Sequence, residues 1–119
     1  MKKKIKFLQV IPRLGMGGAE TGCYDLAHYL HEQKCKSFII TSGGQLLKYI
    51  NKKKVKVFKL PVHSKNPILI LLNAIIITFI VLIYNINIIH ARSRAPAWSC
   101  LLVAKITKSF LFVFTTYFS

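Results

Sequence analysis

The sequence alternates between short β-type apolar runs and longer helix-type segments, and this alternation limits the fold more than any other feature. The segments expected to form strands cover residues 5–12, 36–44, 55–62, 86–93 and 109–117. The segments expected to form helices cover residues 19–33, 45–53, 67–84 and 95–107. No hairpin turn signal joins any two of the expected strands. This order predicts βαβ units, and therefore an α/β fold with a parallel sheet and helices on both faces.

A parallel sheet also predicts where a ligand binds. Right-handed crossovers bring the carboxyl ends of all strands to one edge, and open α/β sheets bind ligands at that edge. The segments that reach it here are PRLGMGG, TSGG, PVHSK, HARSR and the last few residues. Because they include the most polar and glycine-rich loops of the chain, we expect a binding site there.

The chain is short and strongly basic. Its 119 residues are enough for one core and too few for two well-formed domains, so a single domain over residues 1–119 is expected. The formal net charge of +15 favours anionic partners such as lipid headgroups, phosphorylated ligands or nucleic acid. Compositional drift in an AT-rich genome produces the same excess of lysine, so the charge alone identifies no partner.

The cysteines and the N-terminus indicate a reduced, cytosolic protein. Cys23, Cys35 and Cys100 are odd in number and widely separated, which fits neither a disulfide framework nor a CxxC-type metal site. The basic start resembles a signal peptide, but its apolar stretch is short and is interrupted by Lys6 and Gln9. A first strand is the better interpretation.

Residues 68–89 carry no charge and have the length of a membrane span. The main alternative is therefore a small basic membrane-associated protein without enzymatic function, with a single span near 68–89. Against it, the helical part would rise only about 25 Å, less than a hydrocarbon core of roughly 30 Å. Asn66 as N-cap and Pro67 at the first helical position predict a helix start. We expect this helix to pack on the sheet, with an outer apolar face that can touch a membrane.

The loop LGMGGAE lies between the first expected strand and the first expected helix. Gly15, Gly17 and Gly18 would let backbone N–H groups approach an anion, and the helix dipole would add about half a positive charge. Arg13 could add a bidentate donor. The spacing matches neither GxGxxG nor GxxxxGK[ST], so dinucleotide binding and P-loop chemistry are unsupported. A tight strand-to-helix turn explains the glycines equally well.

Two further loops carry candidate binding residues. His90, Arg92, Ser93 and Arg94 lie where the end of the fourth expected strand runs into a polar loop, and two arginines beside a histidine could hold a phosphate or an acidic sugar. A solvated loop also explains them. The segment PVHSKNP brings His63, Ser64 and Lys65 to the same edge, where a helix cap is an equal explanation.

The few acidic residues exclude several kinds of active site. No acidic residue follows Glu32, so the chain has no plausible Ser-His-Asp set. No pair of carboxylates is placed for acid–base catalysis. We therefore assign no catalytic residue.

The segments LQVIPRLGMGGAETGCYDLAHYL, LPVHSKNP, IIHARSRAPAWSCLLVAKIT and FVFTTY, in this order, resemble the N-terminal domain of GT-B glycosyltransferases of family 4. The resemblance covers nearly the whole chain and is closest to bacterial enzymes that build lipopolysaccharide or other surface glycans. It implies a Rossmann-like domain that binds mainly the acceptor, while a second Rossmann-like half carries most of the nucleotide-sugar site. It also implies transfer with retention of configuration and no metal or other cofactor.

Carried over by position, the resemblance assigns Gly17 and Gly18 to the donor diphosphate, with Gly15 as support. Arg92 and Arg94 become candidates for the acceptor side, together with Arg13, His90 and Ser93. Relatives usually continue into a TTYHG-like turn, whereas this chain has Phe118 and Ser119 at those places. The expectation is an incomplete acceptor-side domain that is inactive alone and needs a donor domain, for example from a separate chain.

The resemblance also suggests where the protein works. The expected acceptor is a lipid-linked or cell-envelope glycan, and the expected location is the cytoplasm, with peripheral binding to the inner face of the cytoplasmic membrane. Nucleic acid is not an expected partner, because the lysines are spread over strands and loops without a recognition motif.

Overall fold

The computed structural model describes residues 5–15, 18–63, 66–91, 105 and 110–113. They form a five-stranded sheet in the order β3-β2-β1-β4-β5, in which every neighbouring pair is parallel. The strands are β1 (Lys6–Val10), β2 (Lys36–Thr41), β3 (Val55–Lys59), β4 (Ile88–Ala91) and β5 (Phe110–Val113). The predicted α/β fold with a Rossmann-like parallel sheet is confirmed. The strands begin and end within the predicted segments.

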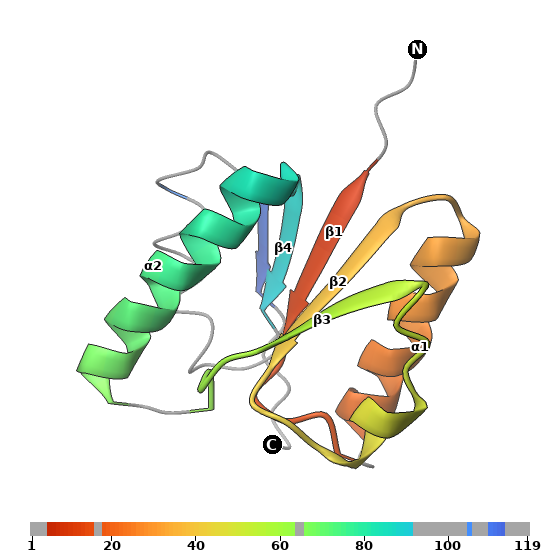
Figure 1. Cartoon of the computed structure of the whole chain (residues 1–119), viewed down its shortest axis with the longest axis horizontal. Helices are drawn as coiled ribbons and strands as arrows, with labels where there is room; N and C mark the ends of the chain where they lie inside the picture. The colour runs from red at the N-terminus through yellow and green to blue at the C-terminus, as the bar shows by residue number, and fades with distance from the viewer. Residues whose placement is uncertain (1–4, 16–17, 64–65, 92–104, 106–109, 114–119) are drawn as a thin grey trace.

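A helix covers each face of the sheet, as the alternation predicts (Figure 1). Helix α1 (Gly18–Glu32) packs on one face and helix α2 (Pro67–Tyr84) on the other. Successive side chains of β2 point to opposite faces, so Ile39 joins the core under α1 while Phe38 and Ile40 join the core under α2. Both cores consist almost entirely of aliphatic side chains, as expected for a parallel sheet buried on two sides.

The helix predicted at residues 45–53 does not form over that range. The structure has only a short 3-10 helix there, η1 (Gln45–Tyr49). Gly44 precedes it and has no side chain to cap the first turn. Asn51 then starts a new turn, because its side-chain Oδ1 accepts a hydrogen bond from the Lys53 N–H at 3.0 Å. This local bond competes with helix continuation, and the pattern of apolar residues alone did not reveal it.

The helix boundaries predicted for α2 are confirmed. The Asn66 side chain accepts a hydrogen bond from the Ile68 N–H at 3.0 Å, and Pro67 occupies the first turn. Asn85 ends the helix in a left-handed conformation with φ of 55°. Residues 68–89 are therefore not one helix, since β4 begins at Ile88. Among the described residues, one helix, α2, is both long enough and apolar enough to cross a membrane, by length and composition alone.

The helix predicted at residues 95–107 lies outside the described residues, apart from Lys105. Cys23 and Cys35 are free thiols in the structure, whereas Cys100 lies outside the described residues.

Candidate functional site

Two loops at the carboxyl edge of the sheet are held together by backbone hydrogen bonds. The loop after β1 and the loop after β2 run side by side, with bonds from the Ile11 N–H to the Ile40 carbonyl (2.9 Å) and from the Ser42 N–H to the Pro12 carbonyl (3.0 Å). The Ser42 hydroxyl donates to the same Pro12 carbonyl. Leu14 extends the pairing, because its N–H donates to the Gly43 carbonyl at 2.7 Å. The loop after β1, which carries the glycine motif, is thus hydrogen-bonded along its backbone to the loop after β2.

Gly44 is where the two loops meet most closely. It has φ of 145°, and a Cβ added there would lie only 2.2 Å from the carbonyl oxygen of Leu14. No other residue fits this place without moving the backbone. The TSGG loop was expected at this edge, but this role of Gly44 was not predicted, because it depends on a contact thirty residues away along the chain. The two adjacent glycines after an expected strand were the only available signal.

Gly15 is a different kind of glycine. A Cβ added there would meet no atom of the described residues within 4 Å, so none of these residues requires a glycine at this position. The open space beside Gly15 lies just before the first turn of α1, which begins at Gly18. Arg13 is exposed in the same loop. Gly17 lies outside the described residues.

A buried glutamine fixes α1 relative to the sheet. Gln9 in β1 is fully buried, and its side-chain Nε2 donates to the Cys23 carbonyl of α1 at 3.2 Å. This bond crosses from strand to helix next to the glycine loop. It therefore helps to hold the N-terminal end of α1 over the carboxyl edge. Gln9 was interpreted only as an interruption of an apolar run, and its spacing gave no further signal.

His90 lies within β4 and is not part of a loop. It is in register with Gln9 of β1, and only 7% of it is exposed. Its ring packs edge-on against Phe7, with ring centroids 5.9 Å apart. The other candidates on this segment, Arg92, Ser93 and Arg94, lie outside the described residues. A role in acceptor binding stays a prediction for all four.

The third predicted loop is only partly described. His63 is exposed between β3 and α2, at the same edge as the glycine loop, whereas Ser64 and Lys65 lie outside the described residues. Over the described part of the chain, no three His, Cys, Asp or Glu side chains come together as metal ligands.

The chemistry available at this edge is anion binding. The N-terminal end of α1 lies at the carboxyl edge, and a helix N-terminus presents backbone N–H groups and a partial positive charge there. Arg13 and the open space at Gly15 lie beside them. The strand order and a glycine loop leading from β1 into α1 define a Rossmann-like ligand-binding domain.

Comparison with known proteins shows to which family this Rossmann-like domain belongs. The family model described as Glycosyltransferase Family 4 matches residues 16–118. A glycosyltransferase from Rickettsia africae ESF-5 is 40% identical, with a TM-score of 0.84 over 94% of this chain. The chain belongs to Glycosyltransferase Family 4. It spans 30% of the length of the Rickettsia enzyme.

A second structural match shares only the fold. The C-terminal domain of a hydrogenase from Pyrococcus furiosus has a TM-score of 0.64 over 95% of this chain and 92% of its own, at 13% identity. A search of curated proteins gave no significant match. The family assignment therefore rests on sequence similarity, since the fold alone occurs in proteins of unrelated function.

Proposed function

We propose that this chain is the acceptor-side half of a glycosyltransferase that moves a sugar from a nucleotide-sugar donor to a lipid-linked or cell-envelope glycan. The observation that carries the proposal is the paired-loop structure at the carboxyl edge, in a chain of Glycosyltransferase Family 4. The donor's remaining contacts would come from a second Rossmann-like half, in the same or another polypeptide.

The donor diphosphate would approach the backbone at Gly15 and Gly18, with Gly17 between them. Three features support this contact: the open space at Gly15, the start of α1 at Gly18 and the rigid support from Gly44. A phosphate oxygen there would accept hydrogen bonds from backbone N–H groups at the N-terminal end of α1. Rigid support matters because a binding loop that must first order itself binds more weakly.

The acceptor would bind on the side of β4, through Arg92, Arg94 and Ser93, with Arg13 from the glycine loop. Arginine side chains suit anionic acceptor groups because the guanidinium forms paired hydrogen bonds to phosphate or carboxylate. His90 would support this region from within the sheet, given its buried position beside Phe7. We assign no residue of this half as the catalytic base or nucleophile, and we expect no metal to be needed.

Replacement of Gly15 by valine tests the donor contact. The added Cβ meets no atom of the described residues within 4 Å, so the fold is expected to survive while the side chain fills the space proposed for the diphosphate. Gly22→Val is the matched control, because Gly22 also has open space around its Cβ but lies within α1. Binding of UDP- and GDP-sugars can be followed by NMR chemical-shift changes.

We expect loss of nucleotide-sugar shift changes in Gly15→Val and their retention in Gly22→Val. Equal binding by both variants would contradict a diphosphate at the glycine loop. Turnover is the second readout: the chain alone should transfer no sugar to membrane-extracted acceptors, because half of the preorganised cleft is missing. Robust turnover by the purified chain would contradict the proposed division between two halves.

A further inference from the structure

The polarity of α2 is inverted relative to that of an ordinary surface helix. Asn73 faces the protein, since it is 2% exposed and donates from Nδ2 to the Pro61 carbonyl at 3.0 Å, while Thr78 is half-buried and its hydroxyl donates to the Ala74 carbonyl of the same helix. The outer face is apolar instead. Eight large aliphatic or aromatic side chains, from Ile68 to Ile83, are each 40% to 69% exposed. We call this surface the α2 stripe.

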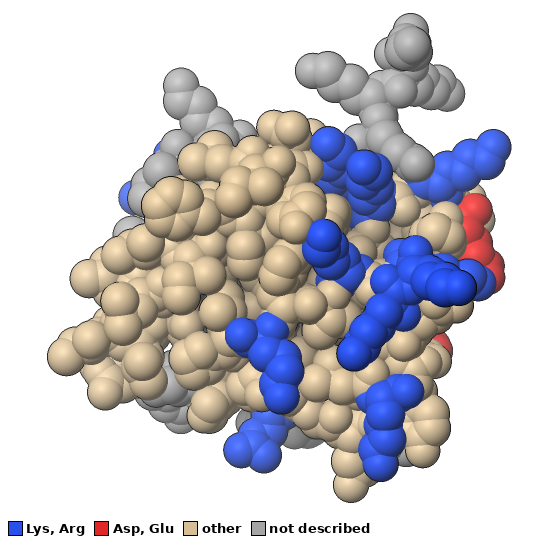
Figure 2. Space-filling model, viewed as in Figure 1, with Lys and Arg blue, Asp and Glu red and all other residues tan. Residues whose placement is uncertain are grey.

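The α2 stripe runs along the whole helix. Its members, which include Leu72, Phe79 and Leu82, recur at intervals of three or four residues and so lie on one side of the helix. Surface helices of proteins that stay in water carry polar or charged residues on that side. Figure 2 shows the surface over α2 without acidic or basic side chains in this view. An exposed apolar surface of this extent marks an interaction site.

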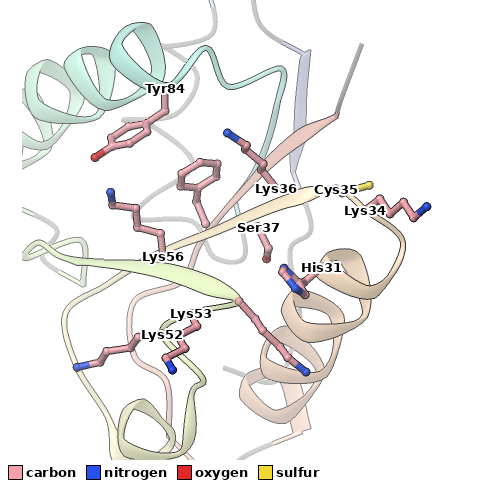
Figure 3. A pocket seen from close by; sticks show the side chains of 11 residues that line it. His31, Lys34, Cys35, Lys36, Ser37, Lys52, Lys53, Lys56 and Tyr84 are labelled. Carbon is pink, nitrogen blue, oxygen red and sulfur yellow. The ribbon is translucent and has the colours of Figure 1, made fainter. Parts of the chain in front are cut away.

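A basic hollow adjoins the C-terminal end of the stripe. It has a volume of about 660 Å³ and lies at the amino-terminal edge of the sheet, where Tyr84 of α2 meets the starts of β2 and β3 (Figure 3). Among the residues that the structure describes, six lysines and no acidic residue line it: Lys34, Lys36, Lys52, Lys53, Lys54 and Lys56. We call these the hollow lysines.

Tyr84 lines the hollow and ends the helix that carries the stripe. The Lys56 ammonium lies 4.5 Å from the centre of the Tyr84 ring, and Tyr84 directly follows Ile83 of the stripe. Figure 3 shows Lys36 and Lys56 on the same side of the sheet as Tyr84. Cationic and apolar groups therefore meet at one place.

We propose that the α2 stripe and the hollow lysines dock this protein on the surface of a bilayer that contains anionic lipids. An apolar helix face buried at the headgroup–acyl boundary, with lysines beside it, is the arrangement that binds such a surface. Each hollow lysine near the membrane attracts the anionic leaflet, and the stripe removes its apolar surface from water. Among the hollow lysines, Lys36 and Lys56 should contribute most, because they lie on the same side of the sheet as Tyr84 of α2.

Two other occupants of the stripe fit the structure less well. A second copy of this chain would bring another formal charge of +15 next to the first, which opposes association. A transmembrane position would pull α2 away from the sheet, breaking the Asn73 bond to Pro61 and exposing buried side chains such as Ile77 and Val81. Interfacial docking leaves both contacts intact.

Docking would also set the orientation of the candidate site. The N-terminal end of α2 lies at the carboxyl edge, which is the edge of the glycine loop. A bilayer along the stripe would therefore bring this edge close to the lipid surface. A lipid-linked acceptor would then lie close to the candidate site. This consequence rests on the proposed function, whereas the docking itself does not.

Co-sedimentation of the full chain with vesicles tests the proposal. Vesicles of phosphatidylcholine alone are compared with vesicles that also contain phosphatidylglycerol, at low and high salt. The stripe variant is Phe79→Gln with Leu82→Gln, and its matched control is Tyr29→Gln, because Tyr29 is an equally exposed aromatic residue on α1. The lysine variant is Lys36→Gln with Lys56→Gln. Its control is Lys48→Gln with Lys59→Gln, both exposed and outside the hollow.

We expect the chain to sediment with the anionic vesicles. The stripe variant should bind at least about tenfold more weakly, because it loses buried apolar surface. The lysine variant should lose about fivefold per lysine on anionic vesicles only, and salt should reduce this difference. Both controls should bind as the unchanged chain does. Since all substituted side chains are exposed, circular dichroism should show an unaltered fold.

Three results would overturn the proposal. The first is the absence of binding to anionic vesicles, or an equal loss in the stripe variant and Tyr29→Gln. The second is resistance of the bound chain to carbonate extraction, which would indicate a span in place of interfacial docking. The third is a dimer in sedimentation velocity that the stripe variant dissociates, without any vesicle binding, which would make the stripe a self-association surface.

Discussion

At the scale of single residues, the three described glycines near the candidate site have different structural roles. Gly44 must be glycine because Leu14 occupies the space of its Cβ, whereas Gly15 has open space around it. Gly18 begins α1. The first glycine thus maintains the structure of the loops, and the second leaves room beside them for a ligand.

Replacing Gly44 by alanine is expected to lower the free energy of unfolding by roughly 3 kcal/mol, because backbone strain adds to a steric clash. Urea denaturation of the full chain measures this. Gly15→Ala is the control and should change the free energy by less than about 0.5 kcal/mol. Similar stability of the two variants would contradict the close packing of Gly44 on Leu14.

Gln9 provides a second test at this scale, because its amide is buried beside the Cys23 carbonyl. In Gln9→Glu, burial should raise the pKa of the new carboxyl group above its ordinary value. A pKa raised in the folded state means that stability is retained below about pH 4.3, the ordinary glutamate value, and is lost as the pH rises through the folded-state value. Relative to Gln9→Met, the variant should be less stable by about 2 kcal/mol at neutral pH. Parallel stability–pH curves for the two variants would show that the site is solvated.

At the scale of elements, α2 combines a well-defined start and end with an unusual distribution of polarity. Asn66 and Asn85 define the ends, and Asn73 between them faces inward. The helix therefore packs on the sheet through one apolar side and exposes a second apolar side to solvent. Most of its stability should come from packing on the sheet, with a smaller share from its caps.

Replacement of the N-cap residue Asn66 measures how much the cap contributes to the stability of the protein. Asn66→Ala should lower the free energy of unfolding by about 1 kcal/mol, because the Ile68 N–H loses its acceptor. Asn66→Asp keeps an acceptor and adds a charge that favours the helix dipole, so it should be at least as stable as the unchanged chain. Thermal unfolding followed by circular dichroism compares the three proteins. An unchanged midpoint in Asn66→Ala would mean that the cap is not formed in solution.

At the scale of the whole molecule, charge is distributed very unevenly. All three acidic residues, Glu20, Asp25 and Glu32, lie in α1, while lysines crowd the loop before β3 and the starts of β2 and β3. Figure 2 shows blue side chains over much of one half of the molecule and red ones only at its rim. The folded state therefore contains strong repulsion among cations.

Salt is expected to stabilise the fold by screening this repulsion. The midpoint of thermal unfolding should rise as ionic strength increases from about 0.01 M to about 0.15 M, because the Debye length falls from about 30 Å to about 8 Å. Lys53→Glu should raise the midpoint most at low salt, since it places an anion among the hollow lysines. A midpoint independent of salt in both proteins would show that the lysines do not repel one another measurably.

The sequence by itself determined the order of strands and helices, the class of fold and the edge at which the glycine loop lies. These follow from local periodicity, from caps such as Asn66 and from the parallel arrangement that alternation imposes. Periodicity failed at residues 45–53, where a short 3-10 helix ends at Tyr49 and the Asn51 side chain starts a new turn.

Only the tertiary structure decided what supports the glycine loop and which side of α2 faces outward. Gly44 meets Leu14, Gln9 reaches Cys23 and Lys56 reaches Tyr84 across separations that no local pattern encodes. Since almost every residue of α2 is apolar, hydrophobic periodicity could not tell its buried side from its exposed side. The inward position of Asn73 became visible only when the helix packed against the sheet.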